Sequence, residues 1–139
     1  MNYKIVGQYI KNLDFKIPSP KVFSLLSKNI SNYKINIDIK SNQLKDKIIE
    51  IETSLNLMPV KNDFEKINTK IIYSTIIELS EEIKDKKEIE EIILINVPSK
   101  IYPELRKIFV FIFESSGFKD IKISDNVDFQ QLYNLRKNQ

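Results

Sequence analysis

The fold is decided by residues 97–133, which read VPSKIYPELRKIFVFIFESSGFKDIKISDNVDFQQLY. From Ile101 to Phe113 apolar side chains recur every three or four residues, and this spacing lines one face of a helix. Gly117 suits the left-handed conformation that ends a helix. We therefore predict a buried helix that begins around Pro103, where a proline in the first turn costs little, and that ends at Gly117. A kink at Pro103 between two helical pieces is the alternative.

The end of the same stretch predicts a short C-terminal helix. Asp128 can accept hydrogen bonds from the first free amides, and Gln131, three residues later, gives a partial capping box. Three apolar residues would anchor this helix on the rest of the chain: Phe129, Leu132 and Tyr133. We expect residues 136–139 to form a frayed tail.

The first half of the chain alternates apolar and polar residues with a period of two, the pattern of half-buried strands. The alternating runs cover residues 3–17, 33–39, 49–57 and 67–79. In the first run the apolar residues, Tyr9 among them, fall on odd positions and should share one face. Short polar connections, including a hairpin turn at residues 61–63, favour an antiparallel meander. Residues 18–32 read as a linker, and residues 81–96 as a loop followed by a short helix or an extended piece.

Composition limits the chemistry that the chain can perform. Its 139 residues are the size of one domain, and it contains neither cysteine nor histidine. Gly7 and Gly117 are its only glycines, so no glycine-rich loop can hold a phosphate. We therefore expect no metal, no cofactor and no enzyme activity. Glu50 and Glu52 share a strand face, but paired acids on a strand are usually solvated, and no other group supports catalysis.

Charge and hydropathy bear on possible partners. The net charge is +3, and lysine is mixed with acidic residues throughout, as is typical of a solvated surface. Arg106 and Arg136 are the only arginines, although arginine is the usual residue for reading nucleic acid. A small α+β interaction or nucleic-acid-binding domain with no export role remains the alternative function. No segment has the roughly 20 apolar residues of a membrane helix, so we expect a cytoplasmic protein without direct membrane insertion.

Three segments together carry a family resemblance. They are residues 8–15 (QYIKNLDF) followed by Pro18, residues 97–106 (VPSKIYPELR), and the pair 117–118 (GF) with 127–133 (VDFQQLY). In this order and spacing the chain resembles the SecB family of bacterial protein-export chaperones. Each motif is weak alone, but together they span nearly the whole chain.

The resemblance implies an α+β fold with one domain over residues 1–139. A four-stranded antiparallel sheet would carry a long helix and a short C-terminal helix on one side. It also implies a cytoplasmic homotetramer, built as a dimer of dimers, that has no cofactor. Such a chaperone binds unfolded preproteins, keeps them competent for translocation and delivers them to the SecA motor.

The resemblance also implies a client-binding or assembly strand. Its residues here would be Ile67, Thr69, Ile71 and Tyr73. A groove could be lined by the apolar patch Phe23, Leu25 and Leu26. Ordinary core or subunit contact is the alternative role for both sets. A chaperone of this kind needs exposed apolar grooves and open strand edges, and lysines beside a groove would favour acidic clients and repel basic ones.

The family's SecA-facing positions are acidic, but in this chain they are Asn12, Lys16 and Lys70. Asp14 and Glu78 lie nearby and are the acidic residues that could take their place. We therefore expect fold and client binding to follow the family more closely than the SecA contact does.

Overall fold

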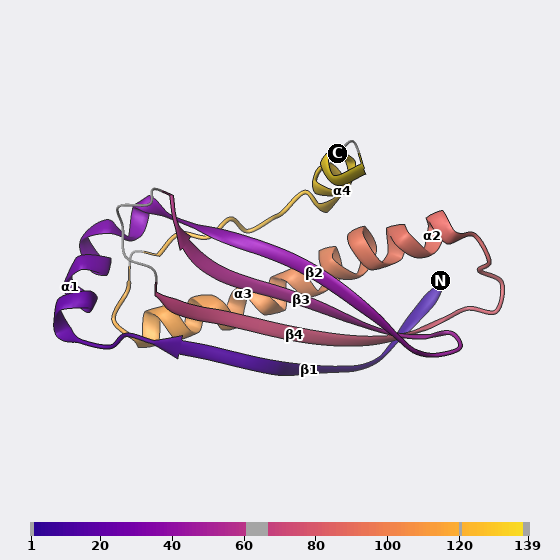
Figure 1. Cartoon of the computed structure of the whole chain (residues 1–139), viewed down its shortest axis with the longest axis horizontal. Coiled ribbons are helices and arrows are strands. Elements are labelled where there is room, and N and C mark those ends of the chain that lie inside the picture. Colours follow the sequence, from indigo (N-terminus) through magenta and orange to yellow (C-terminus); the bar gives the residue numbers. More distant parts are fainter. Residues whose placement is uncertain (1, 61–66, 120, 138–139) are drawn as a thin grey trace.

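The computed structural model describes residues 2–60, 67–119 and 121–137, and it has an α+β fold (Figure 1). Four strands form one antiparallel sheet in the order β1-β4-β3-β2. The strands are β1 (Tyr3–Lys16), β2 (Tyr33–Lys45), β3 (Ile48–Pro59) and β4 (Asn68–Leu79). The predicted strands are thus confirmed, whereas the predicted turn at residues 61–63 lies outside the described residues.

The meander predicted for all strands is wrong for β1. Strands β2, β3 and β4 follow one another, but β1 pairs with β4 at the far edge. The chain therefore crosses the end of the sheet between β1 and β2 (Figure 1). This connection is a helix, α1 (Pro20–Asn29), followed by a 3₁₀ turn at Ile30–Asn32, rather than a linker. Ser19 starts α1, because its Oγ accepts a 3.2 Å hydrogen bond from the Val22 amide and Pro20 needs no amide partner.

One face of the sheet, the inner face, is covered by the helices. Its central strands carry an apolar row of buried side chains, Ile49, Ile51, Leu55, Ile71 and Ile77. The long helix α3 (Val97–Ser115) packs on this row through Val97, Ile101, Leu105, Phe109 and Phe113. The ring of Phe113 meets that of Phe15 on β1 edge-on, with centroids 5.1 Å apart. The opposite, outer face carries the alternate residues of each strand, and none of the helices of the described residues lies on it (Figure 1).

Strand β1 contains two irregularities that the alternation did not predict. The register with β4 shifts between Ile5 and Gly7 and again between Ile10 and Asn12. Each shift leaves one extra residue, and a one-residue shift moves the following side chains to the other face. Tyr9 therefore lies opposite Ser74 on the outer face, and the prediction that it shares a face with the other odd residues is wrong.

The predicted start of the long helix is also wrong. The helical segment begins at α2 (Lys86–Glu91), where Asp85 accepts a hydrogen bond from the Lys87 amide, and continues through a π-helical turn, η2 (Ile92–Asn96), into α3. Pro103 lies inside α3 and is exposed. Because proline has no N–H, the Ser99 carbonyl, four residues earlier, lacks its helical hydrogen bond. Ser99 is exposed, so water can donate to this carbonyl instead.

The π-helical turn has a local cause in Pro98, the first of the two prolines of this helix. The Val97 amide bonds to the Ile92 carbonyl, five residues back, immediately before Pro98. A proline ring clashes with the carbonyl four residues earlier, and a wider turn gives that ring more room. The helix therefore passes both prolines without ending.

The predicted end of the long helix at Gly117 and the predicted start of the C-terminal helix at Asp128 are both confirmed. Gly117 has φ +97°, and the amides of Gly117 and Phe118 bond to the carbonyls of Glu114 and Phe113, which closes α3 in a Schellman motif. Asp128 Oδ1 accepts from the Gln131 amide at 3.0 Å and starts α4 (Phe129–Lys137). Residues 136 and 137 belong to α4, so the predicted tail began too early. Within the described ranges, none of the helices is long and apolar enough to cross a membrane.

Candidate functional site

A groove follows the inner side of β2, the strand at one edge of the sheet. The floor of this groove is a row of half-buried apolar residues, Tyr33, Ile35, Ile37 and Ile39. The segment of residues 121–127 and helix α4 run beside β2 (Figure 1). An edge strand keeps unpaired backbone groups, so this strand offers both apolar side chains and hydrogen-bonding positions.

The groove is hollowed at three neighbouring places along β2. A cavity of about 760 Å³ lies between the Tyr33 end of the strand and residues 121–127. A smaller one, about 160 Å³, separates Ile37 and Ile39 from α4, and a third, about 650 Å³, lies between Ile39 and α2. Ile37 borders the first two and Ile39 the last two, so the three hollows adjoin one another along β2, and we call them together the groove.

The far wall of the groove is the segment of residues 121–127, and side chains of α3 hold it in place. Arg106 donates from Nε and Nη2 to the Ile123 carbonyl at 3.2 and 3.0 Å, and its Nη2 lies 2.9 Å from Asp125 Oδ1. Tyr102 Oη donates to the Ser124 carbonyl at 2.8 Å. Burial raises the pKa of Tyr102, so its hydroxyl stays protonated and keeps donating. Because the segment has no regular secondary structure, these bonds set its distance from β2.

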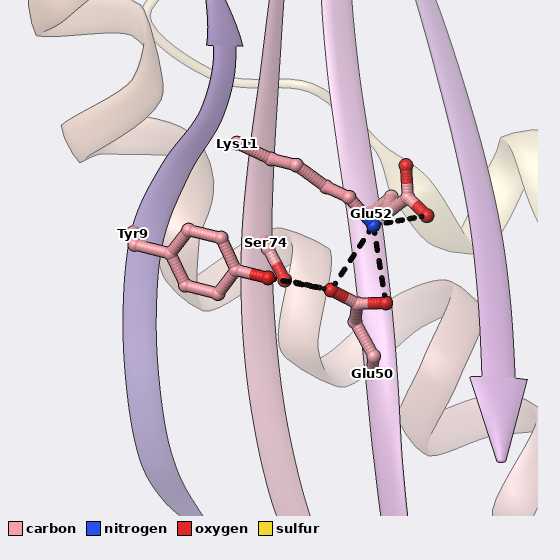
Figure 2. Close-up of polar contacts among 5 residues, drawn as sticks. All are labelled: Tyr9, Lys11, Glu50, Glu52 and Ser74. Carbon is pink, nitrogen blue, oxygen red and sulfur yellow. Dashed lines mark hydrogen bonds and ion pairs between the residues drawn. The ribbon is translucent and has the colours of Figure 1, made fainter. Parts of the chain in front are cut away.

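The outer face carries a network of polar side chains that joins three strands (Figure 2). Glu50 of β3 is only 6% exposed. Its Oε2 accepts from Tyr9 Oη of β1 at 2.8 Å and from Ser74 Oγ of β4 at 2.7 Å. Lys11 Nζ lies 3.3 Å from both oxygens of Glu50 and 3.2 Å from Glu52 Oε2. We call these five residues the Glu50 network.

The Glu50 network keeps its carboxylate ionised. Hydrogen bonds from Ser74 and Tyr9 lower the pKa of Glu50, although burial works in the opposite direction. The hydrogen bond to Glu52 raises the pKa of Lys11, so the pair stays charged. The expectation that strand-face acids are solvated is therefore wrong for Glu50, and the register shifts of β1 that bring Tyr9 over it are the reason.

The hydrogen bonds of the Glu50 network fit a structural role better than a catalytic one. Glu50 already accepts bonds from three side chains on its own sheet, which leaves little capacity for a substrate. Across residues 2–60, 67–119 and 121–137, no cluster of three or more acidic side chains is placed to hold a metal ion.

The residues predicted for the client-binding or assembly strand lie in or next to the core of a single chain. Thr69, Ile71 and Tyr73 are buried on the inner face of β4, and Ile67 is half-buried just before that strand. Their predicted role would therefore need an opening of the core or a contact that one chain does not show, and it stays a prediction.

The residues predicted for the groove lie on α1. Leu26 is buried, whereas Phe23 and Leu25 are 38% and 43% exposed. The ring of Phe23 lies against Phe118, with centroids 5.0 Å apart. The cavity beside β2 is bordered by the following turn of α1 rather than by these three residues. The predicted groove at these three residues therefore lies one turn of α1 away from the cavity beside β2, and it stays a prediction.

The three positions compared with the SecA-facing residues come together on the outer face. Asn12 pairs with Ile72, and Lys16 and Lys70 lie at the same end of the β1–β4 pair. All three are exposed. Asp14 lies directly opposite Lys70, and its Oδ2 accepts a 3.0 Å hydrogen bond from the side-chain Nδ2 of Asn12, whereas Glu78 is near the other end of β4. Of the two nearby acids, Asp14 is the one that shares the surface.

Comparisons of this sequence with known proteins agree on its family. The family model described as preprotein translocase subunit SecB matches residues 1–139. A putative protein-export protein SecB of Pelagibacter ubique (strain HTCC1062) is 40% identical over 137 residues, which cover 99% of this chain and 98% of that protein. The protein-export protein SecB of Anaplasma marginale (strain Florida) is 28% identical, with 94% and 79% covered.

The fold agrees as well. A SecB-like chaperone of Mycobacterium tuberculosis, solved with a ChAD peptide from the HigA1 antitoxin, superposes with a TM-score of 0.63. The match covers 91% of this chain and 88% of that one at 10% sequence identity. The family match over the full length and the 40% identical relative agree with the predicted strands and helices. The chain therefore belongs to the SecB family.

Proposed function

We propose that this chain is a protein-export chaperone that binds unfolded preproteins in the groove along β2 and delivers them to SecA. The observation that carries the proposal is the row of adjoining hollows over the apolar residues of an edge strand. The names of the relatives support a role in protein export, and SecB is a family of chaperones rather than of enzymes. The alternative of an unrelated interaction or nucleic-acid-binding domain gains no support from these findings.

Binding in this groove would not depend on client sequence. An extended segment can add to the open side of β2 through backbone hydrogen bonds, which every sequence offers. Every second side chain of the client would then face Ile35 and Ile37 on the floor and Ile123 on the far wall. Apolar burial of this kind contributes about 25 cal/mol per Å², so a few large side chains suffice for transient holding. That a SecB-like chaperone has been solved with a bound peptide supports peptide binding by this fold.

Delivery to SecA would use the outer face of the sheet, which no helix covers. The surface around Asn12, Lys16 and Lys70 has lost the acids of the family, and Asp14 is the acidic group that remains beside them. We include in the proposal a cytoplasmic homotetramer built as a dimer of dimers. Light scattering tests the assembly, because a mass near the 16.4 kDa of one chain would contradict it.

The experiment for client binding measures how far the protein suppresses aggregation of an unfolded preprotein at equimolar concentration. We expect suppression by the wild type and a marked loss in Ile35→Asp, which places a charge on the groove floor. Asn36→Asp is the matched control, because residue 36 is the next position of β2 and is exposed on the outer face. Absence of suppression by the wild type at every salt concentration would refute the holding function.

A further inference from the structure

The rim of the groove at the Tyr33 end carries charge of one sign. Three lysines from three different elements border the cavity of about 760 Å³: Lys28 of α1, Lys34 of β2 and Lys122 of the far wall. All three are exposed. Neither aspartate nor glutamate is among the described residues that line this cavity. Lysines therefore stand on both sides of an apolar floor.

Within residues 2–60, 67–119 and 121–137, none of these three lysines forms an ion pair. Among the described residues, the lysines that form ion pairs are Lys4 and Lys11, both on β1. The acid on the far wall, Asp125, is already paired with Arg106 on α3. The positive charge on the rim is therefore available to a bound molecule.

The opposite end of the groove, near Ile39, carries charges of both signs. The cavity between Ile39 and α2 is bordered by cations, Lys40, Lys86 and Arg136, and by the acids Glu52 and Glu90. Charges of both signs there favour neither acidic nor basic ligands. Any preference by charge must therefore arise at the Tyr33 end.

We infer that the Tyr33 end of the groove selects extended polypeptide segments in which apolar residues alternate with acidic ones. Alternation sends the apolar side chains to the floor and the carboxylates to the rim, within reach of lysines on either side. A basic segment would meet like charge at the same positions. The inference rests on the proposed function, because it names the client class that this groove takes.

The test compares three short labelled peptides with the same apolar residues, in which the alternate positions are all Asp, all Asn or all Lys. Binding is measured by fluorescence anisotropy with the wild-type protein, so the central comparison needs no variant. Each exposed lysine–carboxylate contact adds little, and three together predict about tenfold tighter binding of the Asp peptide than of the Lys peptide at low salt. At about 1 M salt, where the Debye length is about 3 Å, the difference should largely disappear.

Two charge-reversed variants then locate the effect. Lys28→Glu, Lys34→Glu and Lys122→Glu combined should reverse the order of the Asp and Lys peptides. Combined reversal of exposed lysines away from this cavity, Lys21→Glu, Lys84→Glu and Lys107→Glu, changes the net charge equally and should leave the order intact. An equal effect of the two variants would show that net charge alone acts, and would overturn the inference.

The outcomes separate this inference from the proposed function. The charge preference alone is refuted by one pattern of results. In that pattern the Asn peptide binds and is displaced by an unfolded preprotein, but the wild type binds the Asp and Lys peptides equally or prefers the Lys peptide. If the wild type binds none of the three peptides at any salt concentration, then client binding in this groove is refuted together with it.

Discussion

Replacing Arg106 with alanine should release the far wall of the groove while α3 stays folded. The guanidinium makes two hydrogen bonds to the Ile123 carbonyl and one ion pair with Asp125. Tyr102 would still hold the wall through the Ser124 carbonyl. The change therefore weakens the attachment of residues 121–127 without removing it.

The size of the effect follows from these contacts. Hydrogen bonds from a charged donor to a carbonyl contribute about 1.5–3 kcal/mol in total. The Asp125 side chain is 82% exposed, so its ion pair with Arg106 adds about nothing. Arg106→Ala should therefore cost about 2 kcal/mol, and the open population of the segment should rise about 30-fold.

Native-state proteolysis measures this opening directly. Trypsin can cut after Lys122, which lies within the segment, and the cutting rate follows the open population when opening is fast. We expect about 30-fold faster cutting in Arg106→Ala and an intermediate rate in Arg106→Lys, because lysine cannot reproduce the forked contact. Lys107→Ala, the neighbouring exposed cation on α3, should leave the rate at Lys122 unchanged.

Two results would refute this reasoning. An unchanged cutting rate at Lys122 would mean that Arg106 does not hold the wall. An equal acceleration of cutting throughout the chain would mean that Arg106→Ala unfolds the whole domain, which the local contacts of the side chain do not predict.

Three further changes test the rest of the structure by urea denaturation. Glu50→Gln should lower the free energy of unfolding at neutral pH, because the folded state lowers the pKa of Glu50 from 4.5. The difference from the wild type should be full above pH 4.5 and should shrink as the pH falls through the lowered pKa; a difference independent of pH would contradict this prediction. Tyr9→Phe should cost about 1 kcal/mol by removing one donor to the Glu50 carboxylate, and an unchanged midpoint would show that the bond adds nothing. Gly117→Ala should cost about 1–2 kcal/mol, because φ is +97° and the new Cβ would lie 3.1 Å from the Phe23 ring; equal or greater stability would refute the strain.

Most of the fold could be predicted because its signals are local. Period-two alternation marked the strands, and the apolar repeat with Gly117 marked the body and the end of α3. The start of that helix could not be predicted in the same way. Pro98 and Pro103 normally indicate a boundary, but a π-helical turn and an exposed helix side accommodate them. The edge position of β2 depends on β1 pairing with β4, a contact between residues far apart in sequence.

The candidate site was harder to predict because it depends on that pairing. The alternation at Tyr33, Ile35 and Ile37 was visible in the sequence, but an edge strand beside a groove and a strand inside a sheet have the same pattern. The Glu50 network was missed for a similar reason. The first bulge in β1, between Ile5 and Gly7, turns Tyr9 to the outer face, and the residues around it carry no signal that separates a bulge from a regular strand.

The most direct test of the central claim asks where an unfolded preprotein contacts the chain. The protein has no cysteine, so Ser31→Cys, at the border of the groove, and Lys16→Cys, exposed on β1 at the far edge of the sheet, each give one site for a photo-crosslinker. Binding in the groove predicts crosslinks to the preprotein from position 31 and few or none from position 16. Equal crosslinking from both positions, or crosslinking from position 16 alone, would contradict it.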